Sequence, residues 1–126
     1  MAESLIEYED ACDEVRAVYD DIMRTRKVDS VNNFWKAIAH HPPTLARTWE
    51  SMKAVMADDG VLDPLMKELI YIAVSVANGC DYCIASHTAA ARRKGMTEAM
   101  HGELLAVIGM ASATNALATA RRVPLD

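Results

Sequence analysis

Hydrophobic positions near the start of the chain recur at alternating steps of three and four residues. They are Leu5, Tyr8, Cys12, Val15, Tyr19 and Ile22. This spacing is typical of one face of an amphipathic helix, and Ser4 with Glu7 form a capping-box pattern at its start. The pattern predicts a first helix that begins near Ser4, with Cys12 as a small side chain buried on its apolar face.

Start and stop signals divide the remainder of the chain into further helices. Asp63-Pro64 is a strong start signal, Gly79 and Gly95 are stop signals, and Thr97 is a capping residue. The signals predict helices over residues 31–39, from Leu45 to near Gly60, over 64–78 and 80–94, and from 98 to about 120. No strand pattern, repeat or linker appears. We therefore expect an all-α fold of about six helices in a single domain over residues 1–126.

Composition adds an expectation about assembly. Of the 126 residues, 52% are hydrophobic and only 6% are aromatic, a balance that favours helices over sheets. The apolar fraction exceeds that of ordinary domains. We expect part of this surface to be covered by another subunit, and the first and last helices are the candidate surfaces.

Charge and targeting signals exclude several classes of protein. The net charge is −5, and no basic patch suited to nucleic acid is visible. Arg92-Arg93-Lys94 is interpreted as a set of cations at a helix C-terminus. Residues 1–10 lack the features of a signal peptide, and the apolar stretch 69–77 is too short to span a membrane. These observations predict a cytoplasmic protein without membrane or nucleic-acid partners.

The predicted helix 65–77 is apolar nearly all round, which indicates burial. It nevertheless carries Glu68, Tyr71 and Ser75, which share one face. A buried carboxylate is costly unless it is paired or protonated, so we expect burial to raise the pKa of Glu68. In the alternative interpretation, Glu68 faces solvent at the start of the helix and complements its dipole.

The strongest chemical signal is Cys80-Asp81-Tyr82-Cys83, followed by His87. Unpaired amides at the start of a helix stabilise a thiolate, which is the reactive form of cysteine. Cys83 and His87 are four residues apart and therefore neighbours on one helical face. The spacing of the two cysteines also fits a reversible disulfide.

Counting residues from the turn at Gly79 brings Glu68 close to this pair. Glu68 lies 11 residues before Gly79 and His87 lies eight after it. In antiparallel helices these positions are about 16 and 12 Å from the turn, nearly level. A proton relay from Glu68 through His87 to Cys83 is therefore geometrically possible.

Two arguments compete over which cysteine is the nucleophile. Cys80 is closest to the unpaired amides at the helix start. Cys83 is the cysteine that lies four residues from His87, a potential base. The base argument favours Cys83.

The pattern E-x11-C-x-x-C-x-x-S-H formed by these residues, with Ala39-His40-His41-Pro42 upstream, resembles the alkylhydroperoxidase AhpD-like branch of the carboxymuconolactone decarboxylase superfamily. The resemblance covers roughly residues 34–120. It implies an all-α fold and reduction of hydroperoxides through a cysteine pair, without bound cofactor or metal. It also implies homo-oligomers, often trimers or hexamers, with a dimer also possible.

The resemblance also implies roles for individual residues. Cys83 would be the peroxidatic cysteine and Cys80 the resolving one, while Glu68 and His87 would form the proton relay. Tyr82 stands where the best-studied branch has a histidine between the cysteines. An external dithiol, on a lipoyl-bearing or thioredoxin-like protein, would reduce the disulfide.

Three alternatives use the same residues differently. Cys80, Cys83, His87 and Glu68 could be zinc ligands. The cysteine pair could instead be a non-enzymatic redox sensor that switches a partner, or it could be purely structural.

Overall fold

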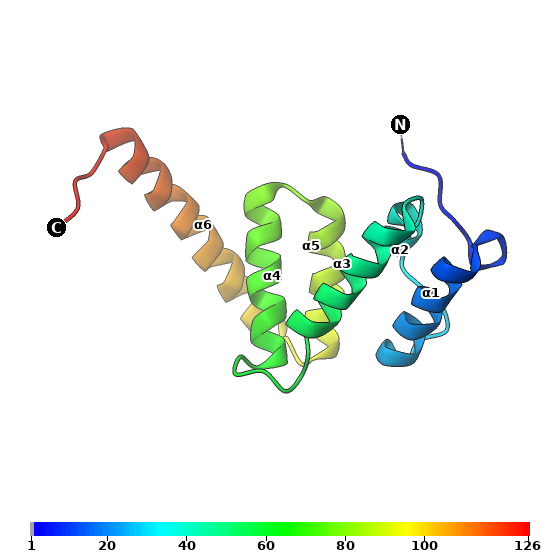
Figure 1. Ribbon diagram of the computed structural model, residues 1–126. Helices are drawn as coiled ribbons and strands as arrows, with labels where there is room; N and C mark the ends of the chain where they lie inside the picture. The colour runs from blue at the N-terminus through cyan, green and yellow to red at the C-terminus, as the bar shows by residue number, and fades with distance from the viewer. Residues whose placement is uncertain (1) are drawn as a thin grey trace. The chain divides into compact units, whose positions relative to one another are not determined.

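The computed structural model describes residues 2–126, and within them it contains helices and no strands (Figure 1). A short 3-10 turn, Tyr8–Asp10, precedes six α-helices. These are α1 (Asp13–Arg26), α2 (Asn33–Ile38), α3 (Pro42–Val55), α4 (Pro64–Asn78), α5 (Asp81–Arg93) and α6 (Glu98–Arg121). The predicted all-α fold of about six helices is confirmed.

Contacts along the chain group into two compact units. One unit ends at Ala57 and contains α1, α2 and α3, and the other begins at Asp58 and contains α4, α5 and α6. The single domain over residues 1–126 stays a prediction.

The core of the first unit is built around two tryptophans. Trp35 and Trp49 are each 2% exposed and meet edge to face, with ring centroids 5.5 Å apart. The Trp49 indole N–H donates to Asp21 at 2.7 Å, and Lys53 contacts the same carboxylate oxygen at 2.8 Å. Hydrogen bonds from Lys53 and Trp49 lower the pKa of Asp21 to about 2. These polar contacts fasten α1 to α3 beside the buried rings.

The start of the first helix differs from the prediction. Helix α1 begins at Asp13, and Cys12 is its exposed N-terminal flanking residue, while the neighbouring Ala11 is buried. The segment before it is held by tertiary hydrogen bonds. The Ile6 N–H donates to the Lys36 carbonyl at 3.2 Å, and the Tyr19 hydroxyl donates to the Ile6 carbonyl at 2.9 Å. A helix from Ser4 and a buried Cys12 were therefore wrong predictions.

In the second unit, α4 and α5 form an antiparallel pair joined by a very short turn (Figure 1). Asp63 caps α4 by accepting from the Leu65 N–H at 2.8 Å. Gly79 ends α4 with a φ of 70°, a left-handed conformation that glycine adopts without steric cost. Ile72, Ala91 and Met96 form the buried core of this unit, with Leu65, Leu69, Val76, Leu104 and Ile108 packed against it.

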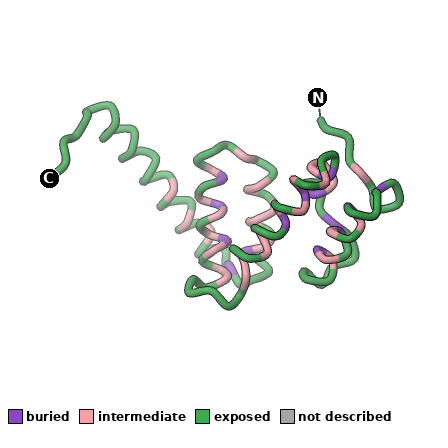
Figure 2. Tube along the Cα trace, in the orientation of Figure 1, coloured by how far each residue is buried: buried purple, intermediate pink, exposed green. Residues whose placement is uncertain are grey.

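Two apolar surfaces of the second unit are exposed. Figure 2 shows the far end of α6 exposed along its length. Met66, Ile70 and Val74 lie on successive turns of α4 and are about half exposed, at 48%, 47% and 54%. On α6, every residue from Gly109 onward is exposed, including Met110 and Leu117. Helix α4 is therefore buried on one side only, and not all round as predicted.

Helix α6 has, by length and composition alone, what a helix needs to cross a membrane. This property of α6 was not predicted from the sequence, because its apolar residues are interspersed with small and polar ones. The composition also suits a helix covered by another subunit.

Candidate functional site

Cys80 and Cys83 form a disulfide at the start of α5, with their Cα atoms 5.3 Å apart. Gly79 turns the chain out of α4, so that Cys80 becomes the capping residue of α5 and Cys83 lies in its first turn. The Cys83 N–H donates to the Cys80 sulfur at 3.2 Å. Both cysteines are half-buried. The motif thus places a sulfur against the unpaired amides of a helix start, where a thiolate is stabilised.

Glu68 on α4 and His87 on α5 are in direct contact. The Nδ1 atom of His87 lies 2.7 Å from Oε2 of Glu68. Glu68 is only 4% exposed, so the interpretation that it faces solvent was wrong. Since an ionised carboxylate only accepts hydrogen bonds, Nδ1 carries the hydrogen. The second ring nitrogen, Nε2, is then the atom that could take up a proton.

Lys94, the residue that ends α5, binds the other oxygen of the same carboxylate. Its ammonium nitrogen lies 2.6 Å from Oε1 of Glu68. The sequence pattern had suggested only an interaction of Lys94 with the helix dipole, so this contact was not predicted. Lys94 lies seven residues after His87, which is two helical turns. That spacing was the available signal that both side chains project from the same side of α5.

The pKa of Glu68 shifts in the opposite direction to the prediction. Burial is the largest single influence and acts to raise the pKa, but hydrogen bonds and charges from His87 and Lys94 together outweigh it. The pKa of Glu68 is therefore lowered, and the side chain is a carboxylate at neutral pH. Because the pKa of Glu68 is lower in the folded state than in the unfolded state, this pairing stabilises the fold at pH values above the unfolded-state pKa. The stabilisation is lost as the pH falls through the folded-state pKa.

Tyr71 completes the surroundings of His87. The two rings are stacked, with centroids 3.6 Å apart and planes inclined by 20°. Tyr71 lies three residues after Glu68, so the two side chains share one face of α4. Glu68 bonds the His87 imidazole and Tyr71 covers its ring. Ser75, the third polar residue of that face, is buried and donates to the Tyr71 carbonyl at 2.7 Å. The Ser75 hydroxyl is therefore hydrogen-bonded within α4.

The four predicted site residues therefore pair as a disulfide and a carboxylate–imidazole contact. Across residues 2–126, no three His, Cys, Asp or Glu side chains converge in a way that could hold a metal ion.

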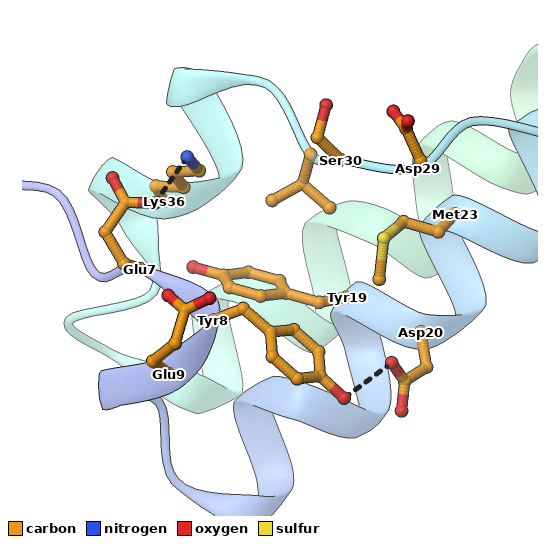
Figure 3. Close-up of a pocket in the computed structure, with 10 residues that line it drawn as sticks. Glu7, Tyr8, Glu9, Tyr19, Asp20, Met23, Asp29, Ser30 and Lys36 are labelled. Atoms are coloured by element: carbon orange, nitrogen blue, oxygen red, sulfur yellow. Dashed lines mark hydrogen bonds and ion pairs between the residues drawn. The ribbon is translucent and has the colours of Figure 1, made fainter.

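A pocket of about 390 Å³ lies in the first unit (Figure 3). Its lining residues are far in the sequence from the four predicted site residues. Its walls include Tyr8, Tyr19 and Asp20, and the Tyr8 hydroxyl donates to Asp20 at 3.0 Å. The pocket contains none of the four predicted site residues and no thiol. The disulfide and the Glu68–His87 pair remain the candidate site, because Cys83 and His87 lie four residues apart on α5 and these groups can exchange electrons and protons.

Comparison with known proteins places these residues in a family. The profile of the carboxymuconolactone decarboxylase family matches residues 42–126, which include all four predicted site residues. A crystal structure of the alkylhydroperoxidase AhpD core from Rhodospirillum rubrum is 59% identical, with a TM-score of 0.88. The match covers 90% of this chain and 83% of that one.

Two uncharacterized proteins are also similar in sequence. One, from Cupriavidus necator, is 31% identical over 85 residues, which is 68% of this chain and 74% of the relative. The other, from the cox locus of Paracoccus denitrificans, is 40% identical over 47 residues, or 37% of this chain and 42% of the relative. The chain therefore belongs to the carboxymuconolactone decarboxylase family, in its alkylhydroperoxidase AhpD-like branch.

Proposed function

We propose that this protein is a thiol-dependent peroxidase that reduces hydroperoxides through a dithiol–disulfide cycle of Cys80 and Cys83. The observation that carries the proposal is the redox-capable pair at the start of α5, on the same helix as an imidazole bonded to a buried carboxylate. Similarity to the AhpD core supports an alkylhydroperoxidase-type function in general.

In the first proposed step, the Cys83 thiolate attacks the terminal oxygen of the hydroperoxide. A sulfur–oxygen bond forms and the oxygen–oxygen bond breaks, which leaves a sulfenic acid on Cys83 and releases an alkoxide. Nε2 of His87 takes the thiol proton beforehand and returns a proton to the alkoxide, so that the alcohol leaves. Glu68 holds the opposite ring nitrogen, as its 2.7 Å contact indicates.

In the second step, the Cys80 thiol attacks the sulfenic sulfur. The disulfide forms, the sulfur–oxygen bond breaks and water leaves, so that one hydroperoxide has oxidised two thiols. An external dithiol then reduces the disulfide. A lipoyl-bearing or thioredoxin-like protein would supply it, in keeping with the cytoplasmic location that we propose.

Tyr82, which lies between the two cysteines, is 44% exposed.

Purified protein should consume an alkyl hydroperoxide when supplied with a dithiol donor, because the cycle requires only the two substrates and the cysteine pair. The measurement is peroxide consumption with a panel of donors, including a lipoyl-bearing protein and a thioredoxin-like protein. The variant Cys12→Ser is the matched control, since Cys12 is exposed and outside the disulfide, and it should retain full activity. Absence of turnover with every donor and peroxide would favour the non-enzymatic sensor.

We also propose that the chain forms homo-oligomers. The exposed residues Met66, Ile70 and Val74 of α4 and the exposed length of α6 supply apolar surface suited to a subunit interface. The apolar face of α1 does not, because Val15, Tyr19 and Ile22 are buried in their own unit.

Light scattering at micromolar concentration should therefore report at least a dimer. Val74→Glu should shift the population toward monomer, because it places a charge in the apolar surface. The control is Val55→Glu, which changes an exposed valine of α3 outside these surfaces. A monomer of 13.8 kDa for the unmodified protein would contradict the proposal.

A further inference from the structure

The Glu68 carboxylate is bonded at both of its oxygens by groups from the neighbouring helix. His87 contacts Oε2 at 2.7 Å and Lys94 contacts Oε1 at 2.6 Å. The Glu68 side chain is 5% exposed and that of His87 is 15% exposed, whereas that of Lys94 is 34% exposed. The lysine thus brings a positive charge from the surface to a buried negative one.

We propose that Lys94 is a positioning residue of the redox site, which balances the charge of Glu68 so that His87 can remain a neutral base. The inference rests on the proposed function for its significance, since a neutral imidazole is needed only if His87 accepts a thiol proton.

The charges of three side chains, Glu68, Lys94 and His87, must balance in this partly buried cluster. With Lys94 present, the ionised Glu68 and Lys94 sum to zero, so His87 can be neutral without leaving a net charge in a buried place. Without Lys94, a neutral His87 leaves one buried negative charge uncompensated. Such a charge is costly, and binding a proton removes the cost. The Glu68–His87 pair should then hold a proton up to a higher pH, as a coupled pair does.

Among the neighbouring groups, Arg92 has a partner of its own and the others carry no charge. Arg92, also in the last turn of α5, bonds Glu98 of α6 at 3.2 Å. From α4, Tyr71 presents its ring to His87. From α6, Leu104 and Ile108 pack against the core of this unit as apolar side chains. On α5, Cys80 and Cys83 are joined in the disulfide and do not titrate in the oxidised protein.

The test uses the oxidised protein, in which thiol ionisation cannot contribute. Nuclear magnetic resonance follows the His87 ring protons against pH, with the signal assigned through a His87→Gln variant. Lys94→Met should move the midpoint of the imidazole titration to higher pH by about one unit or more, because the carboxylate bonded to the imidazole loses its neighbouring positive charge. Lys94→Arg keeps the charge and should restore the original midpoint.

Arg93→Met is the matched control, because it removes the same charge from the adjacent exposed position. An equal shift in this control would overturn the inference, since it would show a general effect of surface charge. An unchanged midpoint in Lys94→Met, or in Lys94→Gln if the methionine variant folds poorly, would overturn it as well.

Peroxide turnover against pH is measured on the same variants. The acidic limb of the profile for Lys94→Met should move to higher pH by the same interval as the imidazole midpoint. If the midpoint moves but no variant, nor the unmodified protein, turns over peroxide, the inference about charge balance stands and the proposed function fails. The two are therefore tested separately.

Discussion

Treated with one equivalent of peroxide and a sulfenic-acid trap, Cys80→Ser should accumulate the adduct on Cys83, and Cys83→Ser should give little or none. In Cys80→Ser the sulfenic acid has no resolving thiol and persists. In Cys83→Ser the remaining thiol of the pair, Cys80, is seven residues from His87 and lacks a base on the adjacent turn. We expect both variants to lose peroxide turnover, because each lacks one half of the disulfide.

One contact in the structure favours the other cysteine as the nucleophile. The Cys80 sulfur accepts the Cys83 N–H at 3.2 Å, and such a bond would stabilise a thiolate on Cys80. If the adduct appears in Cys83→Ser and is absent from Cys80→Ser, Cys80 is the nucleophile and His87 acts in the resolving step. Mass spectrometry of the trapped peptide distinguishes the two residues, and Cys12→Ser in both backgrounds removes the third thiol.

Glu68→Gln should lower the rate of peroxide reduction by about 10²-fold, within the range usually contributed by general acid–base catalysis. Glutamine has the same length and keeps an acceptor for His87, so the fold should be retained. It lacks the negative charge that bonds both His87 and Lys94. An imidazole without that charge is less able to hold a proton taken from a thiol.

The measurement for Glu68→Gln is single-turnover peroxide reduction against pH, together with the rate of thiol alkylation of the reduced protein. Thermal unfolding near pH 7 provides the check that the variant is folded. Glu103→Gln is a suitable control, since it neutralises an exposed carboxylate of α6. Rates and pH profiles equal to those of the unmodified protein would show that Glu68 is structural and that the relay is wrong.

Much of the second unit could be predicted from the sequence, because its helix boundaries are set by local chemistry. Asp63-Pro64 begins α4, Gly79 ends it, and Thr97 begins α6 by accepting the Met100 N–H at 3.1 Å. Each signal acts within a few residues and needs no tertiary information. The level positions of Glu68 and His87 followed from counting residues on either side of a very short turn.

The errors arose where distant contacts decide the outcome. A spacing of three and four residues predicted a helix from Ser4, but the backbone of Ile6 bonds Lys36 and Tyr19 instead. The predicted rise in the pKa of Glu68 considered burial and omitted Lys94, which lies 26 residues away in sequence. Burial of α4 on all sides was inferred from composition, which does not distinguish contact within the chain from contact with a second subunit.

If a second copy of the chain covers the exposed length of α6, folding of the chain depends on its concentration. From Gly109 onward each residue is exposed, so packing within the chain contributes little to this part of the helix. Isolated helical segments of this length are marginal in water. When a second copy covers the segment, the surface that becomes buried stabilises both the helix and the assembly. The apparent stability of the protein would then rise with its concentration by mass action.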